Sequence, residues 1–191
     1  MLEELLISKV RIKIISLFLK NPENVFHVRD ITRRVEAEIN AVRRELKRLT
    51  KIKMLKREER GNRVYYRFRK DFPLFSELLH LIFKEEGLGR AIIENKLRLG
   101  RIKFAVLNEK FVRGRIAKST EIDLLIVGKV SLDHLVALVK AEEERVGHEV
   151  NYSVMGEEEF NFRKKRRDTF IINVLIQPRI MLIGDEVEFV N

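Results

Sequence analysis

Residues 39–49, Ile39-Asn40-Ala41-Val42-Arg43-Arg44-Glu45-Leu46-Lys47-Arg48-Leu49, decide how the rest of the chain is interpreted. On a helix, Val42, Leu46 and Leu49 fall at positions i, i+4 and i+7, which makes one narrow apolar stripe. The side chains that point away from this stripe are polar, and all but one of them are cationic: Asn40, Arg43, Arg44, Lys47 and Arg48. Asn40 also suits the N-cap position, because its side-chain oxygen can accept from a free N–H of the first turn. The stretch predicts a short helix with a buried seam and a basic outer face.

The positive charge of the chain is concentrated around this helix. The 191 residues carry a net charge of +10. Residues 29–70 hold 16 Lys or Arg and 6 Asp or Glu, so this block accounts for the whole excess. Localised positive charge is typical of a module that binds a polyanion, because neutralising phosphates releases bound counter-ions. In the DNA major groove, Arg and Lys can also contact guanine edges and Asn can pair with adenine. The competing interpretation of the helix alone is a solvated face that is basic by chance.

The segments on either side of this helix favour a module that binds a polyanion. Residues 8–20 have helical apolar spacing and end at Asn21-Pro22, and residues 25–28 are β-prone. Asp30 is expected to cap a second helix over 31–35. Two strands, 55–59 and 64–68, flank the Gly-containing turn Arg60-Gly61-Asn62-Arg63, which predicts a basic hairpin.

This order of elements over residues 8–70 resembles the winged helix-turn-helix family, in its arsenic-repressor-like branch. The residues that carry the resemblance are Asp30-Ile31-Thr32, Asn40, the seam Val42, Leu46 and Leu49, Met54-Leu55, and Tyr65-Tyr66-Arg67-Phe68. Many members have Gly where Lys53 stands, so the turn before the hairpin is expected to differ. The resemblance implies that the recognition helix and the wing contact double-stranded DNA. The DNA-binding residues predicted from the basic face and from the resemblance are Asn40, Ala41, Arg43, Arg44, Lys47, Arg48, Lys51, Arg60, Asn62 and Arg63.

Residues 73–84 predict a helix that is too apolar for a solvent-exposed surface. Pro73 opens it, and three Leu and one Ile on one face are joined by Phe75, Leu79 and Phe83. A helix of this kind requires a partner, and we expect a homodimer because operators of such modules are usually two-fold. Glu85-Glu86-Gly87-Leu88-Gly89 is expected to be the linker.

The second half of the chain alternates between helical and strand patterns. Helices are expected over 88–98, 132–146 and 157–176, and strands over 102–107, 121–127, 148–155 and 179–183. This layout is typical of a small α/β domain with a mixed sheet.

Two segments of this half resemble the minimal, archaeal form of the polymerase-beta type of nucleotidyltransferase. They are Phe104-Ala105-Val106-Leu107-Asn108 and, after Gly114, Ser119-Thr120-Glu121-Ile122-Asp123-Leu124-Leu125-Ile126-Val127. That family places a Gly-Ser pair after the first strand to hold nucleotide phosphates. Its two carboxylates on the next strand share one face with a third carboxylate and hold Mg²⁺, which stabilises the displacement of pyrophosphate.

The chain departs from the family pattern at two of these three parts. Leu107-Asn108 stand where Gly-Ser is expected, and Asn151 stands at the third carboxylate. Glu121 and Asp123 match the carboxylate pair and are the predicted metal ligands only if the domain is active. We expect no catalytic residues, no bound cofactor and no enzymatic activity, with Glu121 and Asp123 as solvated acids at the start of a strand.

The amino-acid composition excludes several kinds of site and indicates where the protein resides. There is no Cys, which excludes disulfides, zinc–thiolate sites and thiol nucleophiles, and the charge-rich composition hints at a thermophile. Met1-Leu2-Glu3-Glu4 lacks the pattern of a signal peptide and no apolar run approaches the length of a membrane span, so we expect a cytoplasmic protein. The cluster Arg163-Lys164-Lys165-Arg166-Arg167 suits a salt-bridged helix, a second phosphate contact or a clamp on the carboxylates.

These observations predict an α+β protein with an N-terminal winged helix-turn-helix and a small nucleotidyltransferase-like domain. The expected domains are 1–72 for DNA binding, 73–87 for a connecting helix and linker, and 88–191 for the second domain. The predicted function is a transcriptional regulator in which the second domain dimerises or senses a nucleotide or small-molecule effector. Two alternatives stay open: an active Mg-dependent nucleotidyltransferase that modifies a protein, tRNA or small molecule, and an antitoxin-like or scaffold protein that acts through the 73–84 helix.

Overall fold

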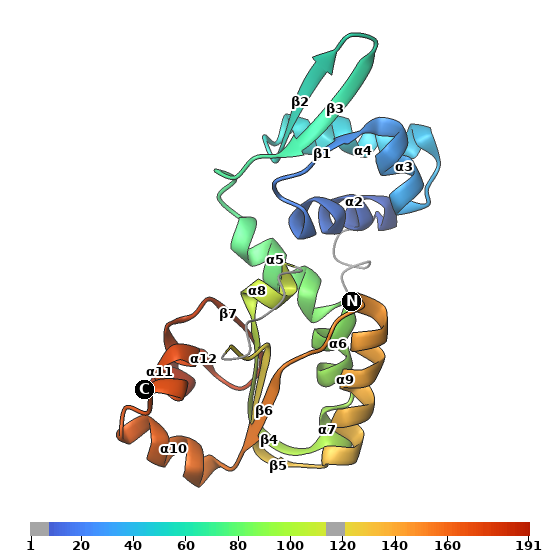
Figure 1. Ribbon diagram of the computed structural model, residues 1–191. Helices are drawn as coiled ribbons and strands as arrows, with labels where there is room; N and C mark the ends of the chain where they lie inside the picture. Colours follow the sequence, from blue (N-terminus) through green and yellow to red (C-terminus); the bar gives the residue numbers. More distant parts are fainter. Residues whose placement is uncertain (1–7, 114–120) are drawn as a thin grey trace. The chain divides into compact units, whose positions relative to one another are not determined.

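A computed structural model describes residues 8–113 and 121–191 (Figure 1). Met1-Leu2-Glu3-Glu4, Gly114, Ser119 and Thr120, which entered the sequence argument, lie outside these ranges. The chain divides into two compact units, with the division between Ile82 and Phe83. Each unit combines helices with its own sheet, which confirms the α+β class and its mixed sheet. Among the helices of the described residues, none combines the length and the apolar run that crossing a bilayer requires.

Over residues 8–82, the described part of the first unit, three helices and a three-stranded sheet are present, and a further helix spans the division between the units. The helices are α2 (Lys9–Lys20), α3 (Val28–Val35), α4 (Ile39–Lys51) and, at the division, α5 (Phe75–Lys84). The strands are β1 (Val25–His27), β2 (Leu55–Arg60) and β3 (Arg63–Phe68). All pairings are antiparallel and β3 is central, with Arg60 opposite Arg63 where β2 turns into β3.

The buried seam of α4 holds the first unit together. Val42 and Leu46 are fully buried and Leu49 nearly so, as the i, i+4, i+7 spacing predicts. They share the core with Ile14 and Phe18 of α2, and the Phe18 ring meets Phe26 edge to face at 5.4 Å between centroids. Because the seam takes up one side of α4, the opposite side faces solvent.

The predicted caps of two helices are wrong. Glu38, not Asn40, is the N-cap of α4, and its carboxylate accepts from the Ala41 N–H at 2.9 Å. His27, not Asp30, is the N-cap of α3, so that helix begins three residues earlier than predicted. Both errors have the same cause: a Glu or His side chain one to three residues upstream reaches the free N–H groups first.

The second unit contains a four-stranded mixed sheet with helices on both faces (Figure 1). Its strands are β4 (Gly100–Asn108), β5 (Leu124–Val130), β6 (Tyr152–Met155) and β7 (Arg179–Ile183). The order is β6-β5-β4-β7, with β5 and β6 parallel and the other pairs antiparallel. The helices are α6 (Gly87–Glu94), α7 (Lys96–Leu99), α8 (Glu109–Val112), α9 (Leu132–Val146), α10 (Glu157–Lys165), α11 (Thr169–Ile176) and α12 (Glu186–Val190).

Successive side chains of the central strands β4 and β5 point to opposite faces of the sheet, and both faces carry a layer of apolar side chains. One face packs against α10, α11 and α12 around Phe104, Phe160 and Phe189, whose rings lie 5.3–5.8 Å apart. The other face is covered by α6, α7 and α9 (Figure 1). A sheet that is buried on both faces explains why β5 has an unbroken apolar run from Leu124 to Val127.

Several expected elements differ in their bounds. The predicted ranges of α9 and β7 are confirmed, whereas the predicted linker is partly wrong because Gly87 already begins α6. The helix expected over 157–176 is two helices, because Arg167 adopts a left-handed conformation (φ 54°) and Asp168 caps α11. The helix expected over 88–98 likewise breaks at Asn95, and the short helices α8 and α12 were not anticipated.

Candidate functional site

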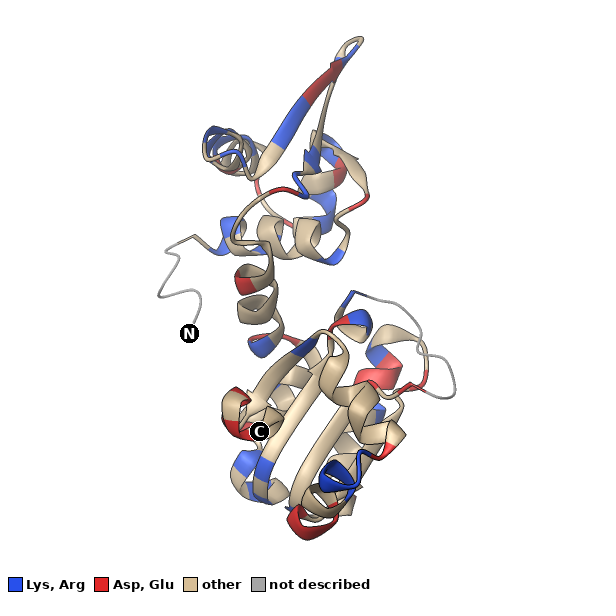
Figure 2. Ribbon diagram, turned by 90° about the vertical axis from the view of Figure 1, so that its left-hand side faces the viewer, with Lys and Arg blue, Asp and Glu red and all other residues tan. Residues whose placement is uncertain are grey.

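The solvent-facing side of α4 and the β2–β3 hairpin carry the predicted DNA-binding residues. Ala41 is half-buried and all the others are exposed: Asn40, Arg43, Arg44, Lys47, Arg48, Lys51, Arg60, Asn62 and Arg63. Basic residues are prominent on the helices and hairpin of this unit (Figure 2). The structure therefore brings the predicted set to the surface of one unit.

Five of these cations have no ion-pair partner in the described part of the chain. Within residues 8–113 and 121–191, Arg43, Arg44, Lys47, Lys51 and Arg63 form no ion pair. Two others do: Arg48 Nη1 lies 3.1 Å from Glu45 Oε1, and Arg60 Nη2 lies 3.0 Å from Glu58 Oε2. An unpaired exposed guanidinium or ammonium is free to bind a phosphate or a base edge.

Glu38 introduces one acidic group at the start of this face. Hydrogen bonds from the backbone N–H groups of Asn40 and Ala41, followed by the charges of Arg44 and Arg43, lower the pKa of its carboxyl. The carboxylate is thus ionised at neutral pH and tied to the helix N-terminus, which a negative charge stabilises. The Glu38 carboxylate therefore disfavours an anion at the first turn of α4, and the cations available to an anionic ligand lie beyond it.

An open groove of about 470 Å³ lies beside the α4 face. It is lined by His27, Val28, Arg29, Arg43, Arg57, Asn62, Arg63, Val64 and Tyr66. Four of these residues are arginines that come from α3, α4, β2 and β3, so the fold joins cations that are up to 34 positions apart in sequence. Positive charge inside a concave surface raises the local concentration of an anionic ligand.

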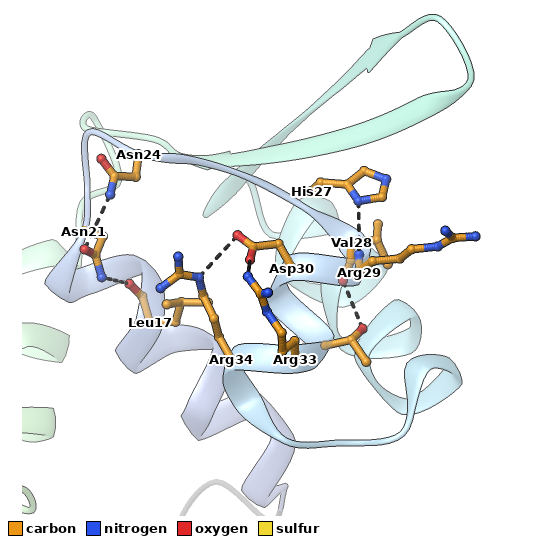
Figure 3. A network of polar contacts seen from close by, with 10 residues as sticks. Leu17, Asn21, Asn24, His27, Val28, Arg29, Asp30, Arg33 and Arg34 are labelled. Carbon is orange, nitrogen blue, oxygen red and sulfur yellow. Dashed lines mark hydrogen bonds and ion pairs between the residues drawn. The ribbon is translucent and has the colours of Figure 1, made fainter.

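The start of α3 forms one wall of this groove (Figure 3). His27 Nδ1 accepts from the Arg29 N–H at 3.3 Å, and the Arg29 side chain extends away from the helix. Asp30 instead accepts from Arg33 at 2.8 Å and Arg34 at 3.2 Å (Figure 3). Arg29 is thus the cation of α3 that remains available, since Asp30 holds the other two.

The second candidate site lies where β4 ends and β5 begins. Asp123 is only 2% exposed, and its Oδ2 accepts from the Asn151 N–H at 2.9 Å. Burial raises the pKa of its carboxyl, outweighing the Asn151 bond and the nearby His148, and Glu121 adds to the rise. Glu121 itself lies 2.6 Å from Lys110 Nζ. Each carboxylate already has a partner within the protein.

Asn108 takes the place that the family pattern gives to the phosphate-holding pair. Its Oδ1 accepts from the Lys110 N–H at 2.9 Å and so caps α8. Its Nδ2 donates to the Ile122 carbonyl at 3.2 Å and to Gln177 Oε1 at 2.6 Å. The side chain therefore links β4, the residues just before β5 and the loop before β7, and both N–H donors of its amide are used.

The cavity between these groups is small. It has a volume of about 20 Å³ and is lined by residues that include Asn108, Asp123, Gln177 and Arg179. This is room for about one water molecule. Within the described ranges no group of three or more His, Asp or Glu side chains could hold a metal ion. Glu121 and Asp123 match two carboxylates of a metal site, and Asn151 contributes its backbone N–H where a third would stand.

The basic cluster 163–167 has mixed partners. Arg163 Nη2 lies 2.6 Å from Glu159 Oε1, which fits the salt-bridged helix, and Arg166 lies over the Phe162 ring at 4.9 Å. Lys165 and Arg167 are exposed and form no ion pair among the described residues. The recorded partners of Glu121 and Asp123 do not include the cluster, so the geometry does not favour a clamp on those carboxylates.

Sequence reasoning missed Glu45, which shapes the first of these sites. Glu45 lies beside the buried seam of α4 and is almost buried, bonded to Arg11 and Arg48. Lys53 follows α4 in a left-handed conformation with φ 62°. The resemblance did point to position 53, where many relatives have Gly, whereas no local sequence signal connects Glu45 with Arg11 across 34 residues.

Comparisons with known proteins give one informative match. No family model matches the chain. A relative from Methanocaldococcus jannaschii, named "Putative protein adenylyltransferase", is 36% identical over 89 residues, which is 47% of this chain and 86% of that protein. The solved structure of human N-acetylserotonin methyltransferase in complex with SAM is similar over 62% of this chain, with a TM-score of 0.32 and 17% identity. The chain spans 36% of that methyltransferase, and a likeness at this level supports no argument.

Proposed function

Since the chain belongs to the family of the archaeal adenylyltransferase-like protein described above, we propose that it joins a nucleotidyltransferase-like unit to a DNA-binding unit and acts as a transcriptional regulator. The first unit is proposed to be a winged helix-turn-helix. Helix α4 enters the major groove of a duplex, and the β2–β3 hairpin lies over the flanking phosphates or in the minor groove. The nucleotidyltransferase-like unit serves for dimerisation or effector binding.

One observation carries this proposal: Arg43, Arg44, Lys47 and Lys51 are exposed along one helix and have no ion pair among the described residues, while the opposite side of that helix is buried. Surface cations in a charge-rich protein usually have carboxylate neighbours, as Arg33 and Arg34 have in Asp30. A row of unneutralised cations on a helix suits the phosphates and base edges of a groove.

The experiment that tests the proposal is binding to DNA fragments selected from a genomic library. An Arg43→Ala/Arg44→Ala variant should bind the selected duplex more weakly by about 1–3 kcal/mol for each side chain that contacts a base. A Lys140→Ala variant removes a positive charge from an exposed position of the second unit and should bind the selected duplex nearly as well as the parent. If the first variant binds as tightly as the parent, α4 is not the recognition helix.

The dimer is a further part of the proposal. Leu74, just before α5, and Leu81 within it are 54% and 45% exposed. Exposed leucines on an apolar helix suit burial against a second copy of the chain, and a two-fold operator would require one. Sedimentation equilibrium of the parent and of a Leu74→Asp/Leu81→Asp variant should give a dimer and a monomer respectively.

The name of the archaeal relative favours a second candidate function, nucleotide transfer from ATP. Mg²⁺ would then be held by Glu121 and Asp123, the two positions that fit a metal site by their chemistry. The absence of a third carboxylate at Asn151 and the engagement of Asn108 in structural bonds argue against it. Incubation with labelled ATP and Mg²⁺ distinguishes the two: label transfer that is lost in an Asp123→Ala variant would establish an enzyme.

A further inference from the structure

Two cations face each other across strands at the far end of β4 from Asn108. Arg101 of β4 is directly opposite Lys129 of β5 in the antiparallel ladder, and both are exposed. Neither forms an ion pair among the described residues. Like charges in directly opposed positions destabilise a sheet. The repulsion between Arg101 and Lys129 should therefore lower the stability of this end of the sheet.

The backbone on both sides keeps the two cations together. Gly100 has φ 115°, and an added Cβ would lie 2.4 Å from the Lys129 carbonyl oxygen. Gly128 has φ 143°, and an added Cβ would lie 2.2 Å from the Arg101 carbonyl oxygen. Both strands therefore approach too closely for any side chain at these two positions, and the register between them sets Arg101 directly opposite Lys129.

The short helix α7 adds two more cations at this end of the sheet (Figure 1). Leu99 ends α7 and its carbonyl accepts from the Ser131 N–H at 2.8 Å, which joins the helix to the residue just after β5. Lys96 and Arg98 on α7 are exposed and also lack an ion pair within the described ranges. We call Lys96, Arg98, Arg101 and Lys129 the strand-end patch. The nearby Asp133 is exposed and forms no ion pair with any of the four.

We propose that the strand-end patch binds the phosphodiester backbone of DNA as a second contact, separate from the α4 face. The inference rests on the proposed function, because it assigns the same ligand to both surfaces. Arg101 and Lys129, held directly opposite each other and without an ion pair among the described residues, suit adjacent phosphates, whose binding would remove the repulsion between them, and Lys96 and Arg98 add positive charge on the preceding helix. Leu97 and Leu132, 93% and 56% exposed, are two apolar side chains near this end of the sheet, which are too few for stable insertion into a lipid surface.

The test measures the salt dependence of binding to a 40-base-pair duplex for the full-length chain. An Arg101→Gln/Lys129→Gln variant should lower the slope of log K against log salt concentration by about 1.8, since two phosphates are no longer neutralised. Its preference among duplex sequences should stay that of the parent. The control, Lys140→Gln, removes an exposed cation of α9 that forms no ion pair among the described residues, and it should leave the slope unchanged.

A second readout does not depend on DNA. Without a ligand, the Arg101→Gln/Lys129→Gln variant should have a higher Tm than the parent, because the cross-strand repulsion is gone. With duplex present at low salt, the parent should gain more in Tm than the variant does.

The possible results separate this inference from the proposed function. If the Arg43→Ala/Arg44→Ala variant loses affinity while Arg101→Gln/Lys129→Gln keeps the parent's slope, the strand-end patch does not contact DNA and the proposed function stands. Equal slopes for Arg101→Gln/Lys129→Gln and for its control also overturn the inference. If the parent does not bind duplex DNA at all, both are wrong.

Discussion

The Arg11 Nε–H donates to Glu45 Oε2 at 2.8 Å and so ties helix α2 to the inner side of α4. Ser8 and Arg48 bond the other carboxylate oxygen at 3.2 and 3.1 Å. Burial alone would raise the pKa of Glu45, but the bonds and charge of Arg11, with Ser8 and Arg48, outweigh it and lower the pKa. An ionised and nearly buried carboxylate therefore fixes the orientation of the helix whose outer face is proposed to bind DNA.

Replacing Glu45 with Gln should lower the free energy of unfolding by about 1–2 kcal/mol at pH 7, because two guanidinium groups lose their anionic acceptor. The effect depends on pH with a definite sign. The folded-state pKa lies below the ordinary 4.5, so this stabilisation is present above pH 4.5 and is lost as the pH falls through the lower, folded value. Urea unfolding of parent and variant over pH 7 to 3 checks this. A Glu144→Gln variant at an exposed position of α9 should match the parent throughout.

Substitutions of Lys53 should change the free energy of unfolding and the affinity for DNA in different ways. Its φ of 62° disfavours a residue that has a Cβ, and the Met54 N–H donates to the Leu49 carbonyl at 3.0 Å to close the end of α4. Lys53→Gly should raise the free energy of unfolding by about 0.5–1 kcal/mol through relief of strain. The same change should weaken binding to all duplexes alike and lower the salt slope by about 0.9, since one phosphate contact is removed. A Lys53→Ala variant, which loses the charge and keeps the strain, should share the lower slope without the gain in stability.

The buried carboxyl of Asp123 should make the free energy of unfolding fall as the pH rises. Because burial raises its folded-state pKa above the ordinary 3.8, the folded state favours the protonated acid, and this advantage is lost as the pH rises through the folded-state pKa. Asp123→Asn keeps an acceptor for the Asn151 N–H and should be more stable than the parent by about 1 kcal/mol at pH 7, with a smaller difference at acidic pH. Thermal unfolding at several pH values measures this. A variant that is less stable than the parent at pH 7 would show that the ionised carboxylate has a favourable partner.

We expect the carboxylate of Glu58, on the β2–β3 hairpin, to oppose DNA binding. Hydrogen bonds from Arg60 and Arg67 lower its pKa, and their side chains lie 3.0 and 2.9 Å from it. Glu58→Gln should free both guanidinium groups and increase the affinity for duplex DNA at low salt. Glu77→Gln removes an exposed carboxylate of α5 and serves as the control. Binding of Glu58→Gln that is no tighter than that of its control would exclude the hairpin from the interface.

The sequence was sufficient for features that depend on local periodicity. The seam of Val42, Leu46 and Leu49 is buried as its spacing requires, and α9 and β7 have their predicted bounds. The positions of exposed cations followed from the same seam, since a helix with one buried side exposes the other.

Features that depend on contacts distant in sequence were not predictable. The cap of α4 is a separate, local error: Glu38, which is outside the usual set of capping residues, accepts from the Ala41 N–H. The bonds of Asn108 to Gln177 and of Glu45 to Arg11 cross 69 and 34 positions. Which cations remain unpaired depends on such contacts, so the sequence could indicate a basic surface but not its available members.

On the β2–β3 hairpin, the counter-ion of Arg60 is a carboxylate of the protein itself, Glu58. A phosphate that binds Arg60 replaces Glu58 rather than a solution anion, and the carboxylate it displaces stays attached to the protein. Such an exchange releases fewer ions to the solvent than contact with Arg63, which has no carboxylate partner among the described residues. Titrations against salt will therefore undercount the arginines that touch the duplex, and the hairpin's share of the affinity will persist at ionic strengths that weaken the helix's share.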